Sequence, residues 1–229
     1  MAEMIATQAR GSGSARRWVR PLLTGGLLAG PLYVVVGAVE ALTRPGFDPT
    51  RDDLSLLSNG PFGWIHIALF ISAGLLTIAG AVGLRRAGDG GDTSVWGPVL
   101  LGLYGLGLIG AGIFVADPMH GFPPGTPAGA HSVSAHGLMH LVSGAVGFLG
   151  LIASCLVFAR RFARVRQTRW ARFSVATGGI FLVAFFGIAG GSRQDGAVLV
   201  AVTLAFTAAV VLAWTWISAV CAKAIRELR

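Results

Sequence analysis

The chain has 229 residues, of which 54% are hydrophobic and only 12% are charged, and its formal net charge is +8 at pH 7. Its mean hydropathy is +0.70. Soluble domains carry about 25% charged residues, so this composition excludes a soluble enzyme, a disordered chain and a typical nucleic-acid-binding protein. It predicts a protein whose surroundings are the lipid bilayer.

Six nearly uncharged segments follow one another along the chain. A helix needs about 20 apolar residues to cross a bilayer, and six segments meet this length once the Gly- and Pro-rich stretches 58–61 and 121–125 are assigned to loops. Apolar residues and glycine fill every face of the segments, as in helices that contact lipid and other helices. The sequence therefore predicts an all-α six-transmembrane-helix bundle, with spans near 20–42, 62–84, 95–116, 135–158, 174–190 and 197–220.

The basic residues predict how the chain crosses the membrane. Of the 18 Lys and Arg residues, 15 lie in the two tails and in the second and fourth connections. Cytoplasmic segments of membrane proteins are enriched in these residues, so we expect both termini in the cytoplasm and a multi-pass protein of the cytoplasmic (inner) cell membrane. The fourth connection, 160–172, holds six arginines and also suits anionic lipid headgroups.

The domain organisation follows from the spans. Residues 1–17 are rich in Gly, Ser and Ala and predict a disordered cytoplasmic tail. Residues 18–222 form the six-span membrane domain, and residues 223–229 form a short cytoplasmic tail. Glycines four residues apart let helix backbones approach closely. They predict tight packing within the bundle or, as the alternative, a homodimer or another membrane-protein partner bound through these small-residue faces.

Two halves of the chain resemble each other. Gly46-Phe47 precedes Gly63-x-x-His66, and Gly121-Phe122 precedes Gly137-x-x-His140 at almost the same spacing. Each Gly-x-x-His opens a long apolar span that ends in Arg-Arg. The pattern predicts a tandem duplication of spans 1–2 and 3–4, which would make His66 and His140 equivalent. Internal repeats in membrane folds often place a site at their junction.

All five histidines fall in the half that is predicted to lie outside: His66, His120, His131, His136 and His140. His136 and His140 are four residues apart, so both rings lie on one helix face. Asp117 ends the third span on the same side. Ionisable groups at membrane depth indicate a functional site by default. We therefore predict a mouth lined by His and Asp side chains at the outer ends of spans one to four.

This mouth has three interpretations. The first is a metal site, with His66, His136, His140 and Asp117 binding zinc and acting on a lipid-like substrate, because three such ligands with one open position let zinc activate a water. The second is a b-type haem with His66 and His140 as axial ligands. In the third, the histidines bond loop carbonyls and carboxylates and hold the outer loops in place.

No catalytic residue is assigned by the sequence, and the choice between an enzyme, a transporter and a scaffold or accessory subunit stays open. The two loop histidines are weaker candidates, since loop histidines are usually solvated. Thr50 and Asp53, three residues apart just before Leu54, predict a capping-box-like start to a short interfacial helix.

Several motifs together resemble a known membrane family. They are Gly30-Pro31-Leu32, Leu54-Ser55-Leu56-Leu57-Ser58, Gly63-Trp64-Ile65, Val115-Ala116-Asp117-Pro118, Gly121-Phe122-Pro123-Pro124-Gly125-Thr126-Pro127 and His136-Gly137-Leu138-Met139-His140. Over roughly residues 22–220 the chain resembles the bacterial and archaeal integral-membrane family catalogued as domain of unknown function 998. The resemblance implies a multi-pass membrane protein without an assigned activity. It supplies no catalytic residues.

Overall fold

The computed structural model describes residues 18–88, 92–127, 133–191 and 196–228. Its elements in chain order are α2 (Val19–Thr43), the short 3-10 helix η1 (Leu54–Ser58), α3 (Gly63–Ala87), α4 (Asp92–Ile113), α5 (Ala135–Arg164), α6 (Thr168–Gly191) and α7 (Ala197–Glu227). The six α-helices are each long and apolar enough to cross a membrane. The predicted six-span, all-α fold is thereby confirmed.

Six helix boundaries differ from the sequence expectation by three residues or more. Helix α3 ends at Ala87, α4 begins at Asp92, and α5 continues beyond the predicted residue 158 to Arg164. Helix α4 ends at Ile113, three residues earlier than predicted, and the chain is irregular from Phe114 to Pro118. Helix α6 begins at Thr168, because its basic first turns continue the helix beyond the apolar stretch. Helix α7 continues past residue 222 to Glu227. The tail predicted to be disordered, 1–17, lies outside the described residues.

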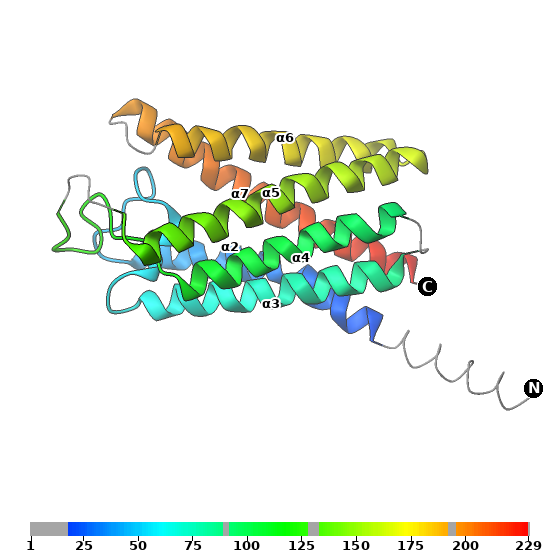
Figure 1. Cartoon of the computed structure of the whole chain (residues 1–229), viewed down its shortest axis with the longest axis horizontal. Helices are drawn as coiled ribbons and strands as arrows, with labels where there is room; N and C mark the ends of the chain where they lie inside the picture. Colours follow the sequence, from blue (N-terminus) through cyan, green and yellow to red (C-terminus); the bar gives the residue numbers. More distant parts are fainter. Residues whose placement is uncertain (1–17, 89–91, 128–132, 192–195, 229) are drawn as a thin grey trace, which may run out of the picture.

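The helices form a closed ring in chain order. Each helix packs against the next, and α7 packs against both α6 and α2, so the last helix returns to the first described one (Figure 1). The Ser218 hydroxyl in α7 donates to the carbonyl of Leu27 in α2 at 2.9 Å. The start of α2 and the end of α7 lie at the same end of the bundle.

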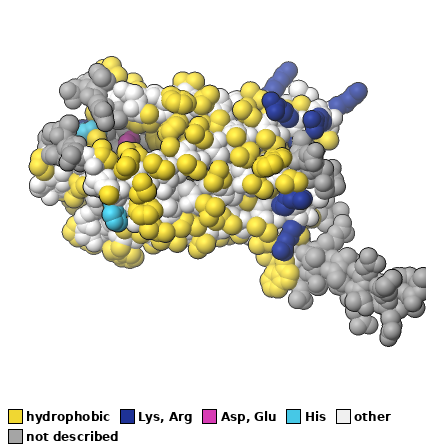
Figure 2. All heavy atoms as spheres, in the orientation of Figure 1, with side chains coloured by type: hydrophobic (Ala, Val, Ile, Leu, Met, Phe, Trp, Pro, Cys, Tyr) yellow, Lys and Arg dark blue, Asp and Glu magenta, His cyan; other side chains and the backbone are white. Residues whose placement is uncertain are grey.

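The two ends of the bundle differ in charge. On the face that Figure 2 shows, Lys and Arg gather at one end, whereas the histidine and acidic side chains lie at the other. We call the first the basic end; it comprises the starts of α2, α4 and α6 and the ends of α3, α5 and α7. We call the second the histidine end; it comprises the segments 40–66 and 111–127 and the start of α5. This separation is the pattern that the positive-inside rule describes.

Glycines bring the helix backbones together inside the bundle. A Cβ atom on Gly26 of α2 would lie 2.7 Å from the Cα of Gly80 in α3 and 2.6 Å from the Sγ of Cys221 in α7. A Cβ on Gly30 would lie 2.8 Å from the carbonyl oxygen of Trp214. These glycines therefore pack α2 against its own neighbours, and a homodimer through other small-residue faces stays a prediction.

Candidate functional site at the histidine end

A buried network of ionisable side chains joins α2 to α3. Glu40, in the last turn of α2, is only 5% exposed, and His66, in the first turn of α3, is fully buried. The carboxylate Oε2 of Glu40 lies 2.8 Å from Nδ1 of His66. Its Oε1 lies 2.5 Å from Nη2 of Arg44, one turn further along the chain. Both oxygens of this carboxylate are thus occupied, which compensates for removing its charge from water.

Arg44 extends the network to the loops. Its Nη1 donates to the carbonyl of Asn59 at 3.2 Å, and its Nη2 also donates to the carbonyl of Phe62 at 3.1 Å. The side-chain amide of Asn59 donates in turn to the carbonyl of Ala116, at 3.1 Å. One guanidinium and one amide therefore hold the entry to α3 against the end of α2 and the connection that follows α4.

A groove opens beside this network on the outside of the bundle. It has a volume of about 380 Å³ and runs between the end of α2 and the start of α3. Its charged lining residues are Glu40 and Arg44, and the rest of the lining is mostly apolar, including Val35, Val36, Val39, Phe62 and Ile65. Val35, Val39 and Phe62 are more than half exposed. The groove thus offers a hydrocarbon-lined surface with an ion pair at its wall.

The imidazole of His66 has one nitrogen bonded and one unpaired. Its Nδ1 is paired with Glu40, whereas its Nε2 is buried without a hydrogen-bond partner among the described residues. The ring lies edge-on to Phe70, with the ring centroids 4.7 Å apart, and to Tyr33, at 6.0 Å. A carboxylate on Nδ1 fixes the orientation of an imidazole and leaves its Nε2 to serve as donor or acceptor.

His140 bonds backward to the preceding helix. Its Nδ1 lies 2.8 Å from the carbonyl of Phe114 and 3.1 Å from that of Ala111. Two carbonyl acceptors at one nitrogen mean that Nδ1 carries the hydrogen and donates. The ring therefore satisfies carbonyls at the C-terminal end of α4, which have no partner within their own helix.

Asp117 and His136 have other neighbours. The carboxylate of Asp117 accepts from the backbone N–H of Ser134 at 2.8 Å and from its hydroxyl at 2.5 Å. The Ser134 hydroxyl oxygen also accepts from the N–H of Gly137 at 2.9 Å, so Ser134 caps α5. His136 is exposed, and its ring lies 5.7 Å from that of Phe114. Asp117 therefore anchors the start of α5.

The four predicted metal ligands do not form one cluster. The described residues contain no group of three or more His, Cys, Asp and Glu side chains that could hold a metal ion. His66, His140 and Asp117 each have the protein partners given above. Zinc at His66, His136, His140 and Asp117 stays a prediction, and it would require these side chains to come together in one cluster. The Nδ1 bonds of His66 and His140 do not oppose it, because a metal-ligating histidine commonly keeps such a partner on its other nitrogen.

A bis-histidine haem does not fit the side chains as they are placed. The ring of Phe70 lies against both imidazoles, with its centroid 4.7 Å from that of His66 and 6.1 Å from that of His140. A porphyrin between the two histidines would have to displace this phenyl ring. The third interpretation predicts histidines that bond carboxylates and carbonyls. His66 and His140 make bonds of this kind.

The two long connections at this end pack on each other. Phe47 and Phe122 meet edge to face with their ring centroids 5.4 Å apart, inside a small apolar cluster completed by Leu56, Leu57 and Ala116. The glycines before these two phenylalanines share a φ of +81°, a conformation that favours glycine. This correspondence is one that the tandem duplication would produce, although the duplication itself stays a prediction.

Acidic side chains and a histidine lie beside this apolar cluster. Nδ1 of His120 is 3.6 Å from the Oδ1 of Asp52, whose carboxylate also accepts from Arg51. Asp53 precedes η1 but makes no side-chain capping hydrogen bond, so its predicted capping role is wrong. The predicted partner Thr50 instead bonds Asp48 through its N–H and its hydroxyl. The loop places Asp53 beside Asp52 and His120, where one of its carboxylate oxygens is buried and has no hydrogen-bond partner within the part of the chain that the structure describes.

We expect the docking of this loop to weaken as the pH rises. Burial raises the pKa of Asp53 to about 6, with the charge of His120 opposing the shift and that of Asp52 adding to it. A folded-state pKa above the unfolded value gives stability that is complete below about pH 4 and lost as the pH rises through about 6. Hydrogen exchange of segment 45–60, corrected for its intrinsic pH dependence, should therefore be faster at pH 7 than at pH 5.

The matched control for this prediction is Asp53→Asn, which cannot ionise. Its corrected exchange should be the same at both pH values. If the corrected exchange rate of the wild-type loop did not change with pH, the prediction would be wrong. If the rate changed equally in Asp53→Asn, another group would cause the pH dependence.

Two contributors to the site were not identified from the sequence. Arg44 is one of the three basic residues that lie outside the two tails and the second and fourth connections, and Asn59 falls in the Gly- and Pro-rich stretch 58–61. The signal for Arg44 was present, since Glu40 and Arg44 are four residues apart at a span end, a spacing that pairs side chains on a helix. Nothing in the sequence indicates that Asn59 bonds Ala116, 57 residues away.

Comparison with known proteins identifies the family of the chain. A family model described as "Protein of unknown function (DUF998)" matches residues 27–223. Neither a curated protein nor a solved structure matches the chain. The matched region takes in most of α2 and α7, all of α3 to α6, the two packed connections and the Glu40–His66 network. It covers most of the chain, and the protein belongs to the DUF998 family.

Proposed function

We propose that this membrane protein binds a lipid-like amphiphile at its histidine end. The hydrocarbon part would lie along Val35, Val39 and Ile65 in the groove, and the polar group would meet Glu40 and Arg44. The observation that carries the proposal is the buried Glu40–Arg44 ion pair at the wall of an otherwise mostly apolar groove on the outside of α2 and α3. Ionisable groups at membrane depth are costly and usually serve a function.

The charges at the groove suggest which polar group would bind. Glu40 and Arg44 carry opposite charges and cancel, so a ligand with a net charge would gain no counter-ion here. A hydroxyl or amide can donate to the carboxylate and accept from the guanidinium, which has five N–H donors. We therefore expect a small uncharged hydrogen-bonding group on a single hydrocarbon chain, such as a monoacylglycerol.

The orientation of the protein is part of the proposal. The positive-inside rule favours the basic end in the cytoplasm and both termini on that side. The histidine end and its groove would then open to the outer leaflet of the cytoplasmic (inner) cell membrane.

Photo-crosslinking tests the binding site. A monoacylglycerol with a diazirine in its acyl chain is added to the purified protein in detergent, and the labelled peptides are identified by mass spectrometry. We expect labelling in segments 35–45 and 62–65. Val39→Trp fills the groove and should reduce this labelling about tenfold, which corresponds to losing about 1.4 kcal/mol of binding free energy. The same change at Val183 of α6, which is 74% exposed, is the matched control.

Equal labelling of segments 35–45 and 62–65 in the Val39→Trp and Val183→Trp variants would overturn the proposal. Glu40→Gln keeps the shape of the side chain and removes its charge, so it separates the polar contact from the apolar one. Elemental analysis of the same samples tests the metal interpretation. If the wild type contained near-stoichiometric zinc and the His66→Ala, His140→Ala double variant did not, a metal-dependent site would take the place of the amphiphile proposal.

A further inference from the structure

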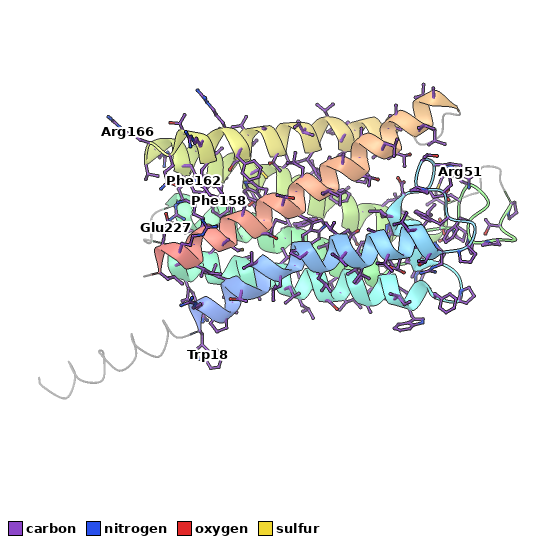
Figure 3. The ribbon with its side chains drawn as sticks, turned by 180° about the vertical axis from the view of Figure 1, so that it is seen from behind. Trp18, Arg51, Phe158, Phe162, Arg166 and Glu227 are labelled. Carbon is purple, nitrogen blue, oxygen red and sulfur yellow. The ribbon has the colours of Figure 1, made fainter. Side chains whose placement is uncertain are left out.

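Two buried side chains inside the bundle have a ring nitrogen without a hydrogen-bond partner among the described residues. They are His66 of α3, whose Nε2 is unpaired, and Trp214 of α7, whose Nε1 is unpaired. Their exposed fractions are 0% and 1%. Figure 3, which views the bundle from behind, shows α7 alongside α2, and α3 packs against α2 as well. Buried polar groups in proteins are nearly always bonded to the protein or to ordered water.

Both rings pack on Tyr33 of α2. The Tyr33 ring stacks on the ring of Trp214, with the centroids 4.9 Å apart, and lies edge to face with that of His66, at 6.0 Å. Tyr33 is itself buried. The two unpaired nitrogens therefore belong to one cluster of aromatic side chains, which we call the Tyr33 cluster and in which α2, α3 and α7 meet.

Open space lies beside the Tyr33 cluster. Gly37 follows Tyr33 by one turn and precedes Glu40 by one turn, on the same buried face of α2. A Cβ atom added to Gly37 would have nothing within 4 Å outside its own stretch of helix. Such space is uncommon, because protein interiors are packed as densely as organic crystals. Tyr33 and Glu40 both contact His66, so we place the open space beside its imidazole.

The two nitrogens require opposite kinds of partner. The carboxylate of Glu40 is an acceptor, so the hydrogen between it and His66 lies on Nδ1, and Nε2 of the neutral ring accepts. The indole Nε1 of Trp214 can only donate. A hydroxyl group can donate to the first nitrogen and accept from the second, whereas a carbonyl or an ammonium cannot do both.

We propose that ordered water binds inside the bundle beside Gly37, where it donates to Nε2 of His66 and accepts from Nε1 of Trp214. The water is one molecule or a short chain. It is the hydroxyl compound that suits a buried position, and globular proteins hold about one buried water per 27 residues. The water extends the hydrogen-bonded path from Arg44 and Glu40, at the wall of the groove, to α7. This site goes beyond the proposed function, since it does not depend on a ligand in the groove.

X-ray radiolysis of the intact protein in detergent tests the proposal. Ionisation of a bound water produces a hydroxyl radical that oxidises an adjacent aromatic side chain, and mass spectrometry identifies the oxidised residue. Water enriched in oxygen-18 marks the oxidations that come from water. Trp216 is the matched control, because it is as buried as Trp214 but its Nε1 donates to Ser174 at 2.9 Å. We expect oxygen-18 to enter Trp214 at least about fivefold more than Trp216, since an ordered water stays beside the groups that bind it.

Variants of His66 separate its two nitrogens. His66→Asn keeps a donor near the position of Nδ1, which can still bond Glu40, and it lacks Nε2. We expect this variant to lower the oxidation of Trp214 to the level of Trp216. His66→Gln keeps a polar atom near the position of Nε2 and should retain more of the oxidation than His66→Asn does.

A second variant tests the site even where His66→Asn fails to fold. Gly37→Val leaves His66 and Trp214 in place and fills the open space with a side chain. It should also lower the oxidation of Trp214 to the level of Trp216.

Three results would overturn the proposal. If Trp214 and Trp216 were oxidised equally in the wild type, no ordered water would lie beside Trp214. If Gly37→Val left the oxidation of Trp214 unchanged, the water would not occupy the space beside Gly37. If the wild type contained near-stoichiometric zinc and His66→Asn did not, a metal and not water would bind Nε2.

The groove at the histidine end supplies the last comparison. If added monoacylglycerol lowered the oxidation of Trp214, the hydroxyl group would come from the amphiphile, and the proposal of water would be wrong. Val39→Trp fills the groove and should leave the oxidation of Trp214 unchanged. Failure of this proposal and failure of the proposed function are therefore distinguishable.

Discussion

Glu40→Ala should lower the free energy of unfolding by about 3–5 kcal/mol, the loss typical of removing one partner from a buried ion pair. The Arg44 side chain is only 8% exposed, and its partner carboxylate is 6% exposed. Without Glu40 the guanidinium keeps its burial but loses its counter-charge, and Nδ1 of His66 loses its acceptor. Equilibrium unfolding in mixed micelles measures the effect. Thiol labelling can follow it, because Cys155 and Cys221 are buried and free.

The chain contains a matched control for this substitution. Lys223 and Glu227 are also four residues apart on one helix, but the Glu227 side chain is 57% exposed. Glu227→Ala should therefore cost at most about 1 kcal/mol. If Glu40→Ala and Glu227→Ala lowered the free energy of unfolding by similar amounts, the Glu40 network would be solvated and would not hold α2 on α3.

Gly26→Ala should destabilise the bundle by about 1–3 kcal/mol, and Gly26→Leu should prevent its assembly. The added Cβ would lie 2.7 Å from the backbone Cα of Gly80 and 2.6 Å from Cys221 Sγ, where three helices meet. Backbone atoms cannot move aside as a flexible side chain can, so extra volume here is converted into strain. The same thiol-labelling measurement applies, since Cys221 lies at the contact itself.

Gly37 of the same helix gives the opposite expectation. A Cβ there has nothing within 4 Å, so Gly37→Ala should leave the protein unchanged or stabilise it by up to about 1 kcal/mol through helix propensity alone. If both alanine variants lost the same stability, the cause would be a general effect on α2 and not the contact with Gly80.

The six spans were predictable because lipid imposes a simple rule. Every backbone polar group inside a bilayer must be bonded within the protein, so a long apolar segment becomes a helix. The same rule explains the errors at the ends. The fifth predicted span, 174–190, leaves out Arg169 and Arg172 because they are charged, whereas α6 begins at Thr168 and includes both. Composition locates the hydrocarbon region and does not locate the last turns.

The site was only half predictable. The i, i+4 spacing of His136 and His140 places both rings on one face of α5, but His140 is buried against α4 and His136 is exposed at the first turn. Helix periodicity gives a direction around the axis and does not say how far the neighbouring helix extends. The bond between Glu40 and His66 depends on the packing of α2 on α3, which the sequence does not reveal for two residues 26 positions apart.

The return of α7 to α2 has a consequence for how the protein is made. Chains are synthesised from the N-terminal side, so α2 enters the membrane well before its second neighbour exists. In the finished bundle, Trp214 and Ser218 of α7 cover the α2 surface around Gly30 and the Leu27 carbonyl, so this surface lacks those contacts until α7 arrives. A nascent chain that stops before α7 therefore keeps an uncovered, glycine-lined surface on α2.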